Sequence, residues 1–117
     1  MASGKWIIVK TAAGYHFNLV SRNRRVIATQ PKVVQSMQEC ENSIFEVKKY
    51  ANENNIIVKM AKNGTFKFSL KHPENESKLL KSETYVKKAG AENGKKSVLK
   101  NIVSDIIEFN NMTDAPE

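Results

Sequence analysis

Few side chains in this sequence could carry nucleophilic or metal chemistry. His16 and His72 are the two histidines, and Cys40 is the single cysteine. A Cys-His nucleophile needs a third group to orient the histidine, and zinc sites typically show Cys-x-x-Cys or His-x-x-x-His spacing. Neither pattern occurs, and Cys40 falls at an apolar position, where a thiol behaves as a small hydrophobic side chain. We therefore predict no catalytic residue, no metal and no cofactor.

Two glutamates suggest a second kind of chemistry. Glu41 and Glu92 occupy matching positions in two predicted helices and could approach each other as an acid-base pair. The simpler interpretation is that each glutamate is solvated near the start of its helix, where the dipole favours a negative charge. We adopt the simpler interpretation.

Basic residues indicate a third possibility, contact with phosphates. Residues 1–34 contain six basic side chains and no acidic one. Such a cluster attracts nucleic acid, although charge also serves solubility. The candidate contacts are the basic residues near two predicted turns and one aromatic ring that could stack on a base: Arg22, Arg24, Arg25, Lys71, Lys78 and Tyr85.

The composition defines what must position these residues. The chain has 117 residues, 40% of them hydrophobic and 26% charged, with a net charge of +7. This length predicts a single domain over residues 1–117. No apolar run is long enough for a membrane helix, and the N-terminus shows no signal peptide. With one cysteine, no internal disulfide can form, so we expect a cytoplasmic protein.

The hydrophobic pattern predicts three strands and a helix in each half of the chain. In the first half the strands begin at Trp6, Tyr15 and Val26, and Ser36 begins a helix with an apolar face. That face consists of Met37, Cys40, Ile44 and Val47. A shift of 51 residues superposes Phe17 on Phe68 and Val47 on Val98, which predicts an internal duplication.

The duplicated pattern resembles the YegP-like family of small bacterial proteins of uncharacterised function. The second half carries the family's motifs, whereas the first half has Pro31-Lys32-Val33-Val34 in place of the second one. The motifs are Phe68-Ser69-Leu70-Lys71, Ser82-Glu83-Thr84-Tyr85 and Asn93-Gly94-Lys95-Lys96-Ser97-Val98. The resemblance implies a β-β-β-α repeat with an exchanged strand after each helix, and no catalytic residue. Lys95 stands where the repeat has the apolar Ile44, and we expect its stem along the core edge with its ammonium in water.

The C-terminal segment gives a different prediction from its periodicity. Apolar residues recur as adjacent pairs every four residues from Val98 to Ile107, and no Gly or Pro interrupts them. This pattern favours one helix from about Lys87 to about Phe109 rather than an exchanged strand.

We therefore predict an α+β fold, a tandem duplication of a β-β-β-α unit. Each half, about 4–54 and 55–109 with a tail at 110–117, forms a three-stranded antiparallel sheet covered by a helix. A pseudo-two-fold axis relates the halves as an intramolecular pseudo-dimer, so we expect a monomer. The leading hypothesis for function is a non-enzymatic binding or structural module of unknown partner. The alternatives are a nucleic-acid-binding protein using the basic hairpin ends, and an enzyme or carrier for a small anionic ligand.

Overall fold

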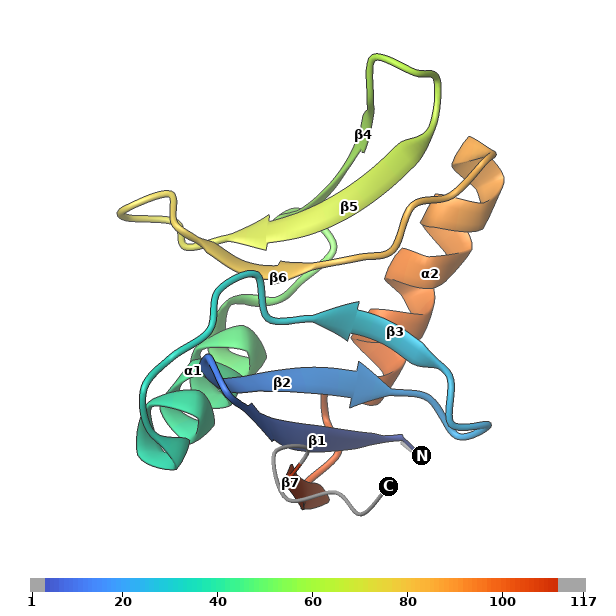
Figure 1. The fold of residues 1–117 in the computed structure, drawn as a ribbon. Helices are drawn as coiled ribbons and strands as arrows, with labels where there is room; N and C mark the ends of the chain where they lie inside the picture. The colour runs from blue at the N-terminus through green and yellow to red at the C-terminus, as the bar shows by residue number, and fades with distance from the viewer. Residues whose placement is uncertain (1–3, 112–117) are drawn as a thin grey trace.

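Seven strands and two helices make up the computed structural model, which describes residues 4–111 (Figure 1). Each half contributes three strands and then a helix, and one more strand follows the second helix. The elements are β1 (Lys5–Thr11), β2 (Gly14–Val20), β3 (Val26–Thr29), α1 (Met37–Tyr50), β4 (Ile56–Met60), β5 (Phe66–Lys71), β6 (Lys78–Lys81), α2 (Lys88–Asn101) and β7 (Ile107–Asn111). The predicted strands and the start of each helix are confirmed.

One mixed sheet contains all seven strands, in the order β4-β5-β6-β3-β2-β1-β7. The prediction of three-stranded antiparallel sheets is therefore wrong, although the fold is α+β. The three strands of the first half join those of the second half where Thr29 of β3 pairs with Lys81 of β6. Strand β7 pairs in parallel with β1. Pairing between the halves satisfies backbone groups that two separate small sheets would expose along their edges.

The two halves keep corresponding positions despite small differences in loop length. The helices begin 51 residues apart, at Met37 and Lys88, and end 51 residues apart. Trp6 pairs with Leu19 as Ile56 pairs with Leu70, so the first strands are offset by 50 residues. The third strands are offset by 52. Loops absorb these single insertions because a one-residue slip within a strand would turn its side chains to the wrong face.

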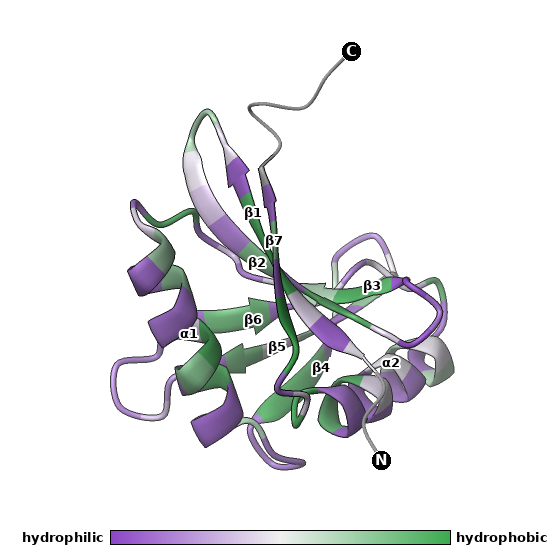
Figure 2. Cartoon of the chain, turned by 90° about the horizontal axis from the view of Figure 1, so that it is seen from below, coloured by the Kyte–Doolittle hydropathy of each residue, from purple (hydrophilic) through white to green (hydrophobic). Residues whose placement is uncertain are grey.

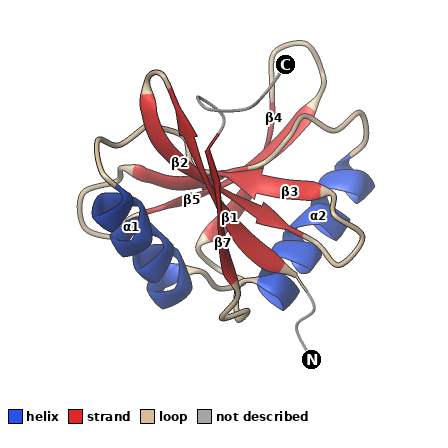
Figure 3. Cartoon of the chain, turned by 60° about the horizontal axis from the view of Figure 1, so that its bottom comes forward, coloured by secondary structure: helices blue, strands red, loops and turns tan. Residues whose placement is uncertain are grey.

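A single hydrophobic core lies between the sheet and the helices. It includes residues of both halves, with the Trp6 and Phe17 rings edge to face at 5.4 Å between centroids. Helix α1 contacts β2 and β6, and α2 contacts strands of both halves, so neither helix covers only its own half. In Figure 3 the strands cross between the two helices. Figure 2 shows hydrophilic and hydrophobic bands on each helix, as this packing requires.

Helix α1 has the predicted start and buried face. The Ser36 hydroxyl accepts a hydrogen bond from the backbone N–H of Glu39 at 3.1 Å, which satisfies one free amide of the first turn. Cys40, Ile44 and Val47 are buried against the sheet. At the matching position of α2, the Lys95 side chain is only 11% exposed, and its Nζ lies 3.5 Å from a Glu53 carboxylate oxygen.

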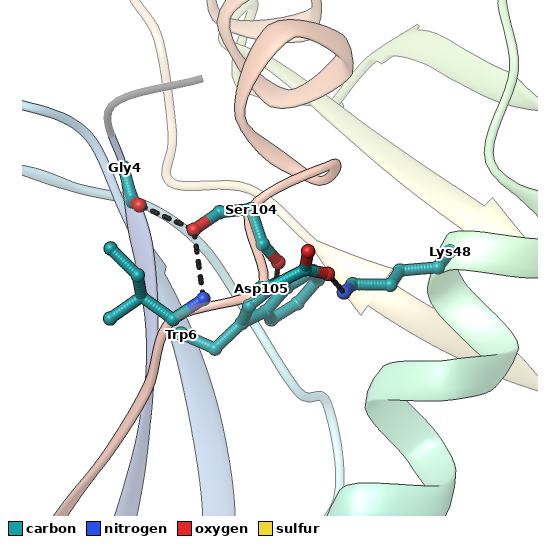
Figure 4. A network of polar contacts seen from close by, with 6 residues as sticks. Gly4, Trp6, Lys48, Ser104 and Asp105 are labelled. Atoms are coloured by element: carbon teal, nitrogen blue, oxygen red, sulfur yellow. Dashed lines mark hydrogen bonds and ion pairs between the residues drawn. The ribbon is translucent and has the colours of Figure 1, made fainter. Parts of the chain in front are cut away.

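The prediction of one helix from Lys87 to Phe109 is wrong, because α2 ends at Asn101 and β7 begins at Ile107. Ser104 organises the change of direction (Figure 4). Its hydroxyl donates to the Gly4 carbonyl at 2.6 Å and accepts from the Ile106 N–H at 3.2 Å, and its carbonyl accepts from Trp6 Nε1 at 3.1 Å. The free edge of β1 then pairs with β7, as the family resemblance implied for the strand after the second helix. Local periodicity carries no information about that distant edge.

Candidate functional site

A cleft of about 820 Å³ lies between the turn that joins β2 to β3 and one side of α2. Its lining consists of basic, amide and hydroxyl side chains, Ile27 and two glycines of α2. The residues are Ser21, Arg22, Asn23, Arg25, Ile27, Tyr85, Gly90, Asn93, Gly94, Ser97, Lys100 and Asn101. From Gly90 to Asn101 the helix rises by about 16 Å at 1.5 Å per residue, so the cleft is elongated.

The cleft is positively charged. Arg22, Arg25 and Lys100 line it, and none of the lining residues is acidic. Arg25 Nη2 lies 3.8 Å from Glu83 Oε2, but both side chains are more than half exposed. An exposed pair at this distance is weak, so the Arg25 guanidinium stays available to an anion.

Tyr85 forms one wall of the cleft because two glycines leave room for its ring. A Cβ at Gly94 would collide with the Tyr85 hydroxyl, and one at Gly90 would lie 3.3 Å from the ring. The ring also stacks on Phe68, with 6.2 Å between centroids. Burial raises the pKa of Tyr85, with a smaller rise from Glu83 and an opposing effect of Arg25. The hydroxyl therefore stays protonated at neutral pH and can donate a hydrogen bond to a ligand.

A corner that corresponds to the cleft lies between α1 and the turn that joins β5 to β6. Side chains fill that corner. There, His72 and Tyr50 pack with ring centroids 4.7 Å apart, and His72 Nε2 lies 3.8 Å from Glu46 Oε2. The 51-residue shift places the much smaller Ser21 at the position of His72.

The other two members of the filled corner are also replaced in the cleft. Asn101 corresponds to Tyr50, and Ser97 corresponds to Glu46. The Asn101 amide donates to the Ser97 carbonyl at 2.8 Å, so it folds back onto its own helix. The cleft therefore results from the divergence of two copies of one corner.

The structure separates the six predicted contact residues. Arg22, Arg25 and Tyr85 line the cleft, whereas Arg24 points to a hollow on the other face of the sheet. Lys71 and Lys78 lie directly opposite each other on β5 and β6. Because β3 and β6 meet at their C-terminal ends, the two basic turns lie on opposite sides of the molecule (Figure 1).

Sequence reasoning missed the α2 side of the cleft. Lys100, Asn101 and the two glycines were not candidates, although Gly94 belongs to a family motif and glycine disfavours the interior of a helix. The signal that could have found them is the comparison of the two repeats. In that comparison, small or polar residues of the second helix replace Tyr50 and Glu46 of the first.

The residues first considered for catalysis do not gather at this cleft. Cys40 is buried, its Sγ lies 3.5 Å from Gln30 Oε1, and burial with a contribution from Glu41 raises its pKa to about 11. Burial lowers the pKa of His16. Between residues 4 and 111 no group of three or more His, Cys, Asp or Glu side chains could hold a metal ion.

The two glutamates that were considered as an acid-base pair lie on different helices, Glu41 on α1 and Glu92 on α2. Within the described chain no hydrogen bond or ion pair joins them.

Among the helices of residues 4–111, none is long and apolar enough to cross a bilayer.

Two similar repeats that share one sheet and one core define a small tandem-repeat α+β protein. The chain belongs to the family described as domain of unknown function (DUF1508), which matches it twice, over residues 11–57 and 61–108. Together with the relatives described next, this match confirms the resemblance to YegP-like proteins.

Individual relatives agree with this assignment. The UPF0339 protein MS1092 of Mannheimia succiniciproducens is 36% identical over 111 residues, which cover 92% of this chain and 96% of that protein. The solution structure of yegP from E. coli, a protein of unknown function, superposes with a TM-score of 0.86 at 26% identity and covers 97% of this chain and 98% of that one. The UPF0339 protein SO3888 from Shewanella oneidensis gives a TM-score of 0.84 at 26% identity, covering 96% and 95%. These relatives are uncharacterised, so the site itself must suggest a function.

Proposed function

We propose that this protein is a non-enzymatic binding module that holds one phosphate-bearing small molecule in the cleft between the β2–β3 turn and α2. The observation that carries the proposal is the cleft's lining of three basic and no acidic residues, at the corner where the larger side chains of the repeat are replaced. In this proposal residues 1–117 form one monomeric domain of two repeats, about 4–54 and 55–109, related by a pseudo-two-fold axis. Residues 112–117 of the proposed tail lie outside the described residues.

The chemistry of the lining supports a phosphate ligand. The guanidinium groups of Arg22 and Arg25 match phosphate oxygens with paired donors, and Lys100 adds a point charge to the lining. The Tyr85 hydroxyl and the Asn93 amide add neutral donors to the same lining. An elongated anion could thus contact several donors at once.

The same lining favours binding over turnover. The lining residues include no carboxylate, histidine or cysteine that could act as a general base or nucleophile. Tyr85 has a raised pKa, which makes it a poor base at neutral pH. We therefore place a binding module ahead of an enzyme.

The proposal is tested by NMR titration of the full-length chain with inorganic phosphate, pyrophosphate and adenosine monophosphate. We expect amide shifts at Gly90, Asn93 and Gly94, and at least tenfold weaker binding in Arg25→Gln. Arg24→Gln is the matched control, since it removes the same charge from the same turn but outside the cleft. Equal effects of both substitutions, or no saturable shift at any of the three amides, would refute the proposal.

A further inference from the structure

A second basic surface lies outside the cleft, on the face of β4, β5 and β6 that points away from the core. Strand β5 alternates Phe66, Phe68 and Leu70 on the core side with polar residues on the outer side. Lysines dominate that outer side, and all of their side chains are exposed. The lysine face consists of Lys59, Lys67, Lys71, Lys78 and Lys81.

The pairing of the strands brings these like charges together. Lys59 lies directly opposite Lys67 on the neighbouring strand, and Lys71 lies directly opposite Lys78. Like charges at directly opposed positions destabilise a sheet. A surface selected for solubility alone intersperses both signs. The arrangement therefore acts against stability.

The lysine face also lacks the carboxylates that neutralise other lysines of this chain. Lys5 pairs with Glu108 at 2.8 Å, and Lys48 pairs with Asp105 at 3.3 Å. Within residues 4–111 no carboxylate lies within 4.0 Å of a lysine on the lysine face. Within these residues none of the five ammonium groups is therefore neutralised by a direct ion pair, although Glu74, Glu76 and Glu83 lie next to the lysine face in sequence.

The first repeat shows that the fold does not require these lysines. The positions of Lys59 and Lys67 are occupied there by Val9 and His16, which lie opposite each other in the same way. The positions of the other opposed pair are taken by Val20 and Val26. The same backbone thus accepts uncharged or weakly basic side chains, so the lysine face is specific to the second repeat.

We propose that the lysine face binds the phosphate backbone of a nucleic acid without reading its base sequence. Lys67 and Lys71 are four residues apart on a rigid strand, about 13 Å at 3.3 Å per residue, so the charges form an extended array. No aromatic side chain lies on this face to stack on bases, which leaves charge as the recognition element. A membrane is the less favoured partner, because stable attachment of a polybasic patch needs a large apolar anchor, and the exposed apolar side chain that β4–β6 place on this face is Ile57 alone.

The test is fluorescence anisotropy with a 20-base-pair DNA duplex that has no terminal phosphate, between 50 and 200 mM salt. If all five lysines contact phosphates, log K should fall against log salt with a slope of about −4.5, at 0.9 per phosphate. A fourfold variant keeps only Lys81 of the lysine face, and its slope should shrink to about −0.9. The substitutions are K59Q, K67Q, K71Q and K78Q.

A control variant removes the same charge from exposed lysines elsewhere and should keep the steep slope. Its substitutions are K32Q, K87Q, K88Q and K96Q. The lysine-face variant should also melt at a higher temperature than wild type, because two repulsive pairs are gone, so weaker binding cannot be blamed on unfolding.

Three results would overturn the proposal. They are equal loss of binding in both variants, absence of binding by wild type at 50 mM salt, and binding to phosphatidylserine vesicles but not to DNA. Arg25→Gln should leave DNA binding unchanged, so this proposal and the cleft proposal fail independently.

Discussion

Replacing Ser104 by alanine tests how the strand β7 is held on the sheet. The substitution removes the donor that satisfies the buried Gly4 carbonyl and the acceptor for the Ile106 N–H. Ser104 is only 6% exposed, so water cannot fully replace its hydroxyl at the Gly4 carbonyl. One buried group left without a partner costs about 1–3 kcal/mol, and Ile106 is exposed enough to find water. We therefore expect a loss of about 2 kcal/mol in the free energy of unfolding.

The assay is thermal unfolding followed by circular dichroism. For a chain of 117 residues, an unfolding entropy of about 2.1 cal/mol/K per residue converts 1 kcal/mol into about 4 °C, so Tm should fall by about 8 °C. Asp105→Asn is the neighbouring control (Figure 4). Asp105 is 99% exposed, and loss of its ion pair with Lys48 should change Tm by less than about 2 °C. A Tm change below 2 °C in Ser104→Ala would refute the reasoning.

Four further predictions follow from burial and packing. Cys40, with a pKa of about 11, should react with a disulfide reagent at pH 8 only after denaturant unfolds the chain, and rapid reaction of the native protein would contradict its burial. Residues 1–54 expressed alone should be unfolded or dimeric by circular dichroism and light scattering, because the core spans both halves; a stable monomer would contradict this. Gly94→Ala should lower Tm, although alanine favours helices, because its Cβ meets the Tyr85 hydroxyl; a higher Tm would show that the ring moves freely. Ile44→Asp should cost at least about 3 kcal/mol in urea unfolding, since a buried charge has no partner there, and a loss below 1 kcal/mol would show that this face is hydrated.

Most of the secondary structure was predictable from local sequence. Alternation of apolar and polar residues identified the strands, and Ser36 with Glu39 identified the start of α1. These signals depend on neighbours within four residues of each other, which is why they survive without knowledge of the fold. The segment around Ser104 was mispredicted, because its apolar pairs suit a helix face as well as an edge strand. The choice was made by hydrogen bonds to Gly4 and Trp6, about a hundred residues away in the chain.

The candidate site was only partly predictable. Arg22, Arg25 and Tyr85 were named from charge and family motif, and the structure gathers these three in one cleft. Lys71 and Lys78 were grouped with them because the repeats place both turns at corresponding positions. Corresponding positions in two repeats need not be near each other in space. Here the meeting of β3 and β6 sends the two turns to opposite sides.

By itself, the sequence determined the α+β class, the duplication and the faces of the strands and helices that are buried, because each depends on the periodicity of side chains along the chain. Only the tertiary structure decided that the two halves share one seven-stranded sheet and that β7 completes the first half. It also decided that one of two similar corners opens into a cleft while Tyr50 and His72 fill the other. These outcomes depend on contacts between residues far apart in sequence. The free energy of pairing two strand edges, or of filling a corner with side chains, depends on the shape of the distant partner and not on the local sequence pattern.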